Sequence, residues 1–297
     1  MIKEIFTSIV IDNLTVNLRH LELENQRSNS TPIVILPGFG GIAEGFRDNM
    51  KSLFEAGYWP LVVDNLGFGG SDKPKDFNYS IKNLVRIIYR WIKKMELDQF
   101  IIVGTSLGGG IALGIREIFN SSVKAVILVA PAGFGRYVLP LYRLGSQPVI
   151  REFFVWVLFN RWVPINQGRN SWKRVVADIS KLPDHFIKSS DLLKQSKGLR
   201  YAYSYILRHY ITLKGQSDRL NQRIHKMCYE LRKSNTPVLI VWGKNDKVIP
   251  IRHASSVIKH TNGQLKLVKK VGHMPYLERP LEFNSIIRSF LLNLEEA

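Results

Sequence analysis

Short apolar runs that alternate with helical patterns are the feature that most constrains the fold of this chain. Each run is continuous, as in a strand that is buried on both faces of a sheet. Such alternation predicts an α/β protein with a mostly parallel sheet and helices on both of its faces. A β-hairpin, formed by residues 5–11 and 15–23, precedes these units. The predicted strands of these units are residues 32–36, 58–63, 100–103, 124–130, 238–242 and 264–271.

The alternation stops between residues 134 and 234. This segment is basic, rich in aromatic residues and mostly helical in pattern, and strand–helix units resume at Pro237. We therefore expect a core domain made of residues 1–133 and 235–297, with a helical cap, or lid, inserted over residues 134–234.

The positive charge of the chain is concentrated in this insert. Of a formal net charge of +18, residues 135–233 contribute +13, with 19 Lys and Arg against 6 Asp and Glu. Such a surface favours anionic partners, and an anionic membrane surface contacted by the basic cap is one prediction. A charge that only keeps the protein in solution is an equal alternative, and nucleic acid is the less favoured partner.

Cysteine content and the N-terminus indicate the cellular setting. Cys228 is the single cysteine, so the chain has no internal disulfide and no cysteine zinc cluster, and we interpret it as a packing residue. Residues 1–6 do not resemble a signal peptide, and no stretch reaches the roughly 18 apolar residues of a membrane-spanning helix. We expect a cytoplasmic protein, which would be peripheral to a membrane if the basic cap binds lipid.

A serine between closely spaced glycines lies where one predicted strand turns into a helix. Residues 104–109 read Gly-Thr-Ser-Leu-Gly-Gly, which places Ser106 between Gly104 and Gly108. In a nucleophile elbow the turn is so tight that side chains at the flanking positions would clash, and the serine oxygen projects above the sheet. The following helix directs backbone N–H groups at any anion formed there. Ser106 is therefore the candidate nucleophile.

Two further strand ends carry the partners that a serine nucleophile needs. Asp246 follows the strand at 238–242, and His273 follows the strand at 264–271. Catalytic side chains of such sheets lie at the carboxyl ends of the strands, where all three residues are expected to meet. A histidine takes the serine proton and returns it to the leaving group, while a carboxylate orients the histidine. The order Ser106, Asp246, His273 predicts an acyl-transfer triad.

With these motifs the chain resembles the α/β-hydrolase superfamily over nearly its whole length. The resemblance implies eight strands, with a helical cap after the sixth, and it is specific for fold and triad but not for substrate. It also implies that the backbone N–H groups of Leu107 and Phe39 form the oxyanion hole. Many relatives have His-Gly where this chain has Pro37-Gly38, which makes Phe39 the weaker assignment. The motifs are residues 104–109, 64–71, 243–246 with Val248 and Pro250, and 272–275 with Glu278 and Pro280.

Other residues of these motifs are interpreted as structural. Asp64 and Ser71 are expected to hold a turn, and Tyr203 and Tyr205 of the cap are expected to pack rather than to catalyse. A serine nucleophile argues against haloalkane dehalogenases and epoxide hydrolases, which resemble this family but use aspartate. The apolar run at 153–159, flanked by Arg151 and Arg161, is interpreted as a buried cap helix in preference to an interfacial helix on anionic lipid.

The resulting hypothesis is a serine esterase or lipase that cleaves carboxylic esters with a hydrophobic acyl group and needs no cofactor or metal. A C–C bond hydrolase of ring-cleavage diketones and an acyltransferase stay open, because their triads look the same. A non-catalytic module that binds lipid or another anionic partner is a third alternative. A nicotinamide-dependent dehydrogenase is a weak rival, based on the G-x-G-x-x-A pattern of residues 38–43 with Asp64 about twenty residues later.

Overall fold

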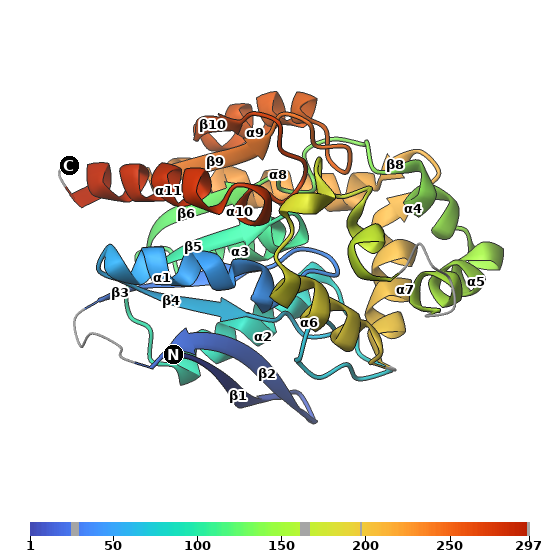
Figure 1. Cartoon of the computed structure of the whole chain (residues 1–297). Helices are drawn as coiled ribbons and strands as arrows, with labels where there is room; N and C mark the ends of the chain where they lie inside the picture. Colours follow the sequence, from blue (N-terminus) through green and yellow to red (C-terminus); the bar gives the residue numbers. More distant parts are fainter. Residues whose placement is uncertain (25–29, 161–166, 197, 296–297) are drawn as a thin grey trace.

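The computed structural model describes residues 1–24, 30–160, 167–196 and 198–295, and Arg161, which was expected to flank the apolar run at 153–159, lies outside these ranges. Its centre is an eight-stranded sheet (Figure 1) in the order β1-β2-β4-β3-β5-β6-β9-β10. The hairpin β1–β2 joins β4 antiparallel, and the strands from β4 to β10 pair in parallel. The strands are β1 (Ile2–Ile11), β2 (Leu14–Leu23), β3 (Thr31–Leu36), β4 (Tyr58–Val63), β5 (Phe100–Thr105), β6 (Val123–Val129), β9 (Val238–Gly243) and β10 (Gln264–Val268).

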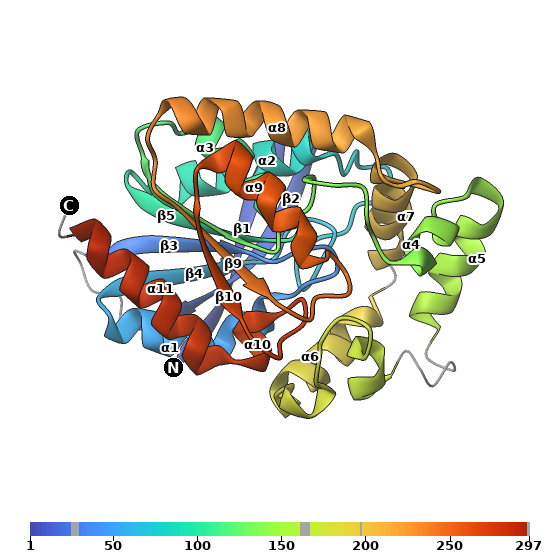
Figure 2. The same ribbon diagram turned by 90° about the horizontal axis from the view of Figure 1, so that it is seen from above.

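Helices cover both faces of this sheet, as the alternating pattern predicted (Figure 2). The side chains of β3 show why: Val34 and Leu36 enter the apolar core on one face, and Ile33 and Ile35 enter the core on the other. The α/β-hydrolase architecture expected from the sequence is therefore confirmed. The helices of the sheet domain are α1 (Arg47–Glu55), α2 (Ile81–Lys94), α3 (Leu107–Ile118), α8 (Asp218–Lys233), α9 (Ala254–Thr261), α10 (Pro275–Glu278) and α11 (Pro280–Glu295), with 3₁₀ turns at Ala43–Phe46 and Ile251–His253.

Helix α2 illustrates how the sequence sets an element. The hydroxyl of Ser80 accepts a hydrogen bond from the backbone N–H of Asn83 at 3.3 Å and caps the first turn. Lys93 and Lys94 lie in the last turn, where positive charge complements the free carbonyl groups. The apolar stripe between these ends includes Trp91, which is fully buried.

The segment after β6 forms a group of helices at one end of the molecule (Figures 1 and 2). This is the end at which the parallel strands finish, so the helices cover the region where a site is expected. Its elements are α4 (Pro140–Gly145), α5 (Pro148–Phe159), α6 (Asp184–Lys194) and α7 (Leu199–Tyr210), two 3₁₀ turns (Gly168–Trp172 and Ile179–Lys181) and the short strands β7 (Ile211–Thr212) and β8 (Gly215–Gln216).

Helix α8 lies on the core although the sequence assigns it to the cap. It packs along α3 and α9 of the sheet domain, and Figure 2 shows it running across that layer. Ile224, Met227 and Cys228 on its inner face are buried in the same apolar core as α2 and α3. We therefore propose that the cap ends near residue 217 and not at residue 234.

Helix α5 differs from the buried cap helix that its sequence favoured. Phe154 and Val155 are buried, but Val149, Phe153 and Trp156 are exposed. The expectation of a buried helix is wrong for this face, because α5 is apolar apart from Arg151 and Glu152 and only one of its apolar sides meets the rest of the cap. Within the described ranges, no helix is both long and apolar enough to cross a bilayer.

Candidate active site

Ser106 occupies the sharp turn between β5 and α3. Its backbone has φ 49° and ψ −114°, a conformation that is strained for a residue with a side chain. The turn is possible because its neighbours are glycines: a Cβ on Gly104 would meet the backbone of Gly108, and a Cβ on Gly108 would meet the backbone carbonyl of Leu36. The geometry is that of the elbow predicted from the sequence.

Asp246 and His273 form a hydrogen-bonded pair across two strand ends. His273 Nδ1 donates to Asp246 Oδ2 at 2.7 Å, and both residues are buried, at 8% and 6% exposure. The second oxygen of Asp246 accepts the backbone N–H groups of Val248 (2.8 Å) and Ile249 (2.9 Å). Both carboxylate oxygens are thus satisfied, which fixes the carboxylate as the orienting partner of the imidazole ring.

The loop that carries His273 is held by Glu278, which lies five residues further along the chain. One oxygen of Glu278 accepts the backbone N–H of Gly272 at 2.8 Å, and the other accepts the N–H of Ala177 at 2.7 Å. The N–H of His273 itself donates to the carbonyl of Val175 at 2.9 Å. The sequence motif pointed to Glu278, but only the structure shows that it ties the histidine loop to the cap segment.

The loop after β3 passes directly beside the elbow. A Cβ on Gly38 would lie 2.9 Å from the Cβ of Ser106, so the close approach requires glycine there. Asn65 donates from Nδ2 to the carbonyl of Pro37 at 2.7 Å and holds the loop in place. Phe39 and Leu107 both line the same cavity as Ser106 and His273. The residues of the predicted triad and oxyanion hole are therefore gathered around one space, with Asp246 behind His273.

This cavity has a volume of about 190 Å³ and is walled mainly by the cap. The ring of Phe39 packs against Tyr203 with centroids 4.2 Å apart, and Tyr203 also meets Phe159 edge-on. Burial raises the pKa of Tyr203, so its hydroxyl stays protonated. The residues of the cap that give the cavity its apolar lining include Val138, Tyr142, Leu158, Phe159, Trp172, Val175, Leu193, Leu199, Ile206 and Leu207.

Lys194 is a lining residue that sequence reasoning missed. Its ammonium group donates to the hydroxyl of Ser171 at 2.6 Å, lies 3.6 Å from Asp191 and sits 5.1 Å from the centre of the Trp172 ring. Burial lowers the pKa of Lys194, and the charge of Asp191 opposes that shift. No sequence signal separates Lys194 from the many other basic residues of the cap, because its position depends on how α6 folds over the core.

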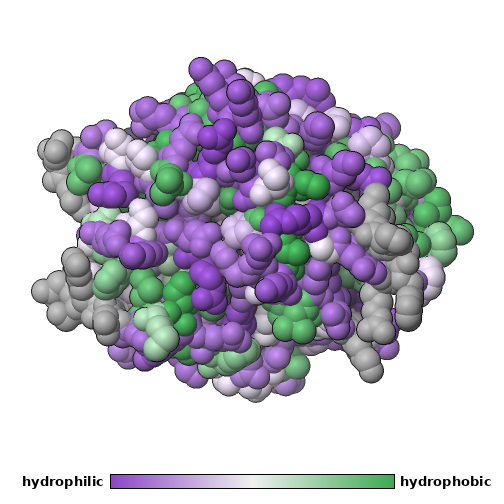
Figure 3. Space-filling view, viewed as in Figure 1, coloured by the Kyte–Doolittle hydropathy of each residue, from purple (hydrophilic) through white to green (hydrophobic). Residues whose placement is uncertain are grey.

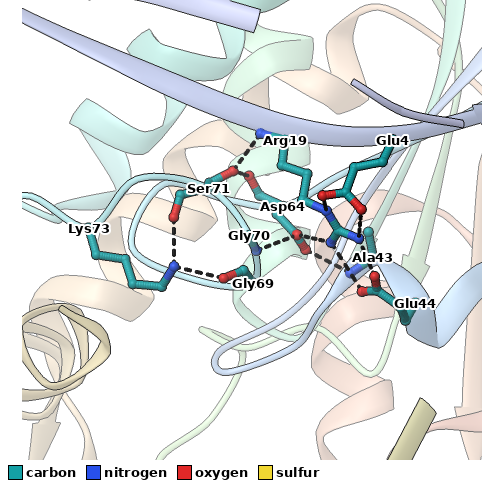
Figure 4. Close-up of polar contacts among 9 residues, drawn as sticks. All are labelled: Glu4, Arg19, Ala43, Glu44, Asp64, Gly69, Gly70, Ser71 and Lys73. Carbon is teal, nitrogen blue, oxygen red and sulfur yellow. Dashed lines mark hydrogen bonds and ion pairs between the residues drawn. The ribbon is translucent and has the colours of Figure 1, made fainter. Parts of the chain in front are cut away.

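Asp64 and Ser71 lie in a second buried polar cluster, around Arg19 (Figure 4). Arg19 is 3% exposed and contacts the carboxylates of Glu4, Glu44 and Asp64, the last at 2.7 Å. Burial raises the pKa of Asp64 to about 6, and the positive charge of Arg19 opposes the shift. Ser71 accepts the N–H of Arg19 (2.9 Å) and donates to the carbonyl of Asp64 (2.7 Å). These contacts support the structural role inferred for both residues.

The same contacts disfavour a dinucleotide at residues 38–43. The carboxylate of Asp64 accepts the backbone N–H groups of Ala43 (2.7 Å) and Gly70 (2.8 Å) besides binding Arg19, and the residue is fully buried. A ribose hydroxyl therefore has no access to it. Across the described parts of the chain, no group of three or more His, Cys, Asp or Glu side chains is arranged to hold a metal ion.

Comparison with known proteins agrees with this architecture. The model of the alpha/beta hydrolase fold family matches residues 31–280. An uncharacterised protein of Mycobacterium tuberculosis is 30% identical over 80% of this chain and 68% of its own length. A 2-hydroxy-6-oxo-6-(2'-aminophenyl)hexa-2,4-dienoic acid hydrolase of Metapseudomonas resinovorans is 27% identical over 93% of this chain and 88% of its own.

Solved structures show the same fold at lower sequence identity. A protein of Acinetobacter baumannii, described provisionally as a lipase, is 20% identical with a TM-score of 0.78, over 99% of this chain and 92% of its own. The 2-hydroxy-6-oxo-6-phenylhexa-2,4-dienoate hydrolase of Rhodococcus is 18% identical with a TM-score of 0.73, over 98% and 99% of the two chains. The family model, the sheet order and the elbow lead to one conclusion: this chain belongs to the α/β-hydrolase fold family and is a hydrolase.

Proposed function

We propose that the protein is a serine hydrolase that cleaves carboxylic esters with a hydrophobic acyl group. The observation that carries the proposal is the buried hydrogen bond between His273 and Asp246, at 2.7 Å, with His273 lining the same cavity as Ser106 on its strained elbow. With Nδ1 engaged by Asp246, Nε2 is the ring nitrogen left to exchange a proton with Ser106.

The reaction follows from these positions. Ser106 Oγ attacks the ester carbonyl carbon while its proton passes to His273 Nε2, and the tetrahedral oxyanion accepts hydrogen bonds from the N–H groups of Leu107 and Phe39. When the tetrahedral intermediate collapses, the bond between the carbonyl carbon and the alcohol oxygen breaks, and the alcohol leaves with the proton from His273. Water then attacks the acyl-enzyme through the same histidine and releases the carboxylic acid. Asp246 stabilises the imidazolium in both halves.

The substrate class is inferred from the cavity. Its cap wall is aromatic and aliphatic, with Leu158, Phe159 and Ile206 among the lining residues. Such a lining favours an acyl chain and gives a charged acyl group few partners. The likeness to a protein described as a lipase supports an ester or lipid-like substrate but does not identify its alcohol.

Hydrolysis of p-nitrophenyl esters from acetate to palmitate tests the proposal. We expect activity with a preference for one range of acyl lengths, and a loss of at least about a thousandfold in Ser106→Ala and in His273→Ala. Folded protein that hydrolyses none of these esters would contradict the proposal. Rates unchanged by either substitution would show that the activity comes from another site.

C–C bond hydrolysis is the second candidate, and it is favoured by a specific observation. The relative from Metapseudomonas resinovorans, whose name describes a dienoic acid hydrolase, aligns with 93% of this chain. Lys194 would supply a positive charge in the cavity wall for a substrate carboxylate. Loss of the absorbance of 2-hydroxy-6-oxo-6-phenylhexa-2,4-dienoate, faster than any ester hydrolysis, would establish this candidate. An acyl product formed with an added alcohol would instead reveal acyl transfer.

A further inference from the structure

The outer face of α5 exposes large apolar side chains to solvent. Val149, Phe153 and Trp156 are 93%, 64% and 59% exposed and follow one another at helical spacing on one face. The rings of Phe153 and Trp156 stack at 5.9 Å, and Leu144 of α4 is 50% exposed. We call these four residues the α5 patch. Figure 3 shows hydrophobic residues gathered at the edge of the molecule where Figure 1 places α5.

The fold does not require this face to be apolar. The opposite side of α5 holds the helix in place, with Phe154 and Val155 packed on Leu207 of α7. Leu158 and Phe159, near the end of the helix, line the active-site cavity. Single exposed apolar residues are ordinary, whereas a contiguous patch that contains two aromatic rings indicates a surface that meets something apolar.

Two grooves with basic linings lie beside α5, and Arg151 and Arg208 line both of them. Trp156 of the patch lines the first groove together with Arg200, so cationic groups adjoin the patch there, and Lys214 lines the second groove. Among the described residues, the grooves together contain seven Lys and Arg against three acids. The three acids are Asp76, Glu152 and Asp218; Glu152 pairs with Arg151 at 3.3 Å, and Asp218 pairs with Arg136 at 2.8 Å.

We propose that the α5 patch docks on a phospholipid bilayer that contains anionic lipid. Aromatic side chains at the boundary of headgroups and acyl chains, with arginines around them, are the combination that holds a protein at such a surface. The positive surroundings select a bilayer over a second copy of this chain, because two such patches would carry like charge into one interface.

Docking would also place the cavity close to lipid. The same helix that presents Phe153 and Trp156 outward presents Leu158 and Phe159 to the cavity. An apolar substrate dissolved in the bilayer would then reach the site without crossing water. This part of the inference rests on the proposed ester hydrolysis, whereas the docking itself does not.

Vesicle co-sedimentation measures the docking separately from catalysis. The Ser106→Ala protein is mixed with phosphatidylcholine vesicles that contain about one third phosphatidylglycerol, so that no lipid is cleaved during the measurement. We expect binding that weakens when phosphatidylglycerol is omitted and when salt screens the headgroups. Adding Phe153→Ser and Trp156→Ser to Ser106→Ala should weaken binding by at least about tenfold.

A matched control removes two exposed apolar side chains elsewhere. Phe6 and Leu281, at 55% and 85% exposure, lie in β1 and α11 of the core, and Phe6→Ser with Leu281→Ser should leave vesicle binding unchanged. In a background with native Ser106, the patch variant should still hydrolyse a short soluble ester, which also shows that it folds.

Two outcomes would overturn the proposal. One is equal vesicle binding by the patch variant and the parent protein. The other is an absence of vesicle binding together with self-association that the patch substitutions abolish, which would make the α5 patch an interface between copies of this chain. Failure of ester hydrolysis with vesicle binding retained would remove only the proposed reaction.

Discussion

Two buried polar clusters in the sheet domain differ in whether their side chains can contact a bound molecule. In the Arg19 cluster, carboxylates surround one guanidinium group, and backbone N–H groups donate hydrogen bonds to the carboxylate of Asp64 (Figure 4). The Asp246–His273 pair is also buried and hydrogen-bonded, but its imidazole lines a cavity beside Ser106. A closed network contributes to stability, whereas a network open to a cavity can exchange a proton with a bound molecule.

The largest expected difference between the two groups is in catalysis. Asp246→Asn should lower kcat for the preferred p-nitrophenyl ester by about 10⁴-fold, because the amide no longer fixes the imidazole tautomer or stabilises its charge. Asp64→Asn is the matched control, since it removes an equally buried carboxylate outside the cavity. Its folded fraction should keep near-native kcat, and a comparable loss in both variants would contradict the distinction.

Substitutions in the Arg19 cluster should have the larger effect on the free energy of unfolding. Arg19→Met leaves Glu44 and Asp64 buried without their cation, which should lower the free energy of unfolding by about 3–5 kcal/mol at pH 7 in urea titrations. The loss should shrink near pH 4, because burial raises the pKa of Asp64 to about 6 and this carboxyl group is then protonated. Arg86→Met, which breaks an exposed pair with Asp12, provides the comparison and should change stability little.

His20 follows Arg19 in β2 and sharpens the comparison with His273. It is fully buried, its ring meets Trp91 edge-on, and Glu22 lies 3.8 Å away. Burial lowers the pKa of His20 to about 4, so the unfolded chain binds more protons between about pH 6.5 and 4. Native stability therefore falls as the pH falls through that window, and His20→Leu should remove about 2–3 kcal/mol of the loss between pH 7 and 4.5. If the free energy of unfolding varied with pH in the same way for His20→Leu and the native protein, His20 would not be the cause of the loss.

The smallest effect is expected from the support of the oxyanion loop. Asn65→Ala removes the hydrogen bond to the Pro37 carbonyl, so the N–H of Phe39 is held less firmly. We expect kcat to fall by about tenfold, equivalent to about 1.4 kcal/mol, with little change in KM. An unchanged kcat would indicate that Phe39 contributes nothing to oxyanion binding. The replacement of the relatives' His-Gly by Pro37-Gly38 would then have changed the role of this loop.

The sequence predicted the parts of the site that depend on local patterns. Strand ends can be found from apolar runs and glycines, so Ser106, Asp246 and His273 could be placed at one sheet edge before the structure was known. The Arg19 cluster could not be found in this way, because Arg19, Glu44 and Asp64 are distant in the chain and share no motif. The exposed face of α5 was not predicted either, because the helix is apolar apart from Arg151 and Glu152 and its sequence does not mark which apolar side is buried.

Labelling with a fluorophosphonate, followed by mass spectrometry of the peptides, shows whether Ser106 is a nucleophile activated by His273. The reagent bonds only to a serine that a neighbouring base activates, and it requires no knowledge of the substrate. We expect a single adduct on Ser106, formed rapidly in the native protein and not formed in His273→Ala. An adduct on another serine, or equal labelling of Ser106 without His273, would contradict the claim that these residues form one catalytic group.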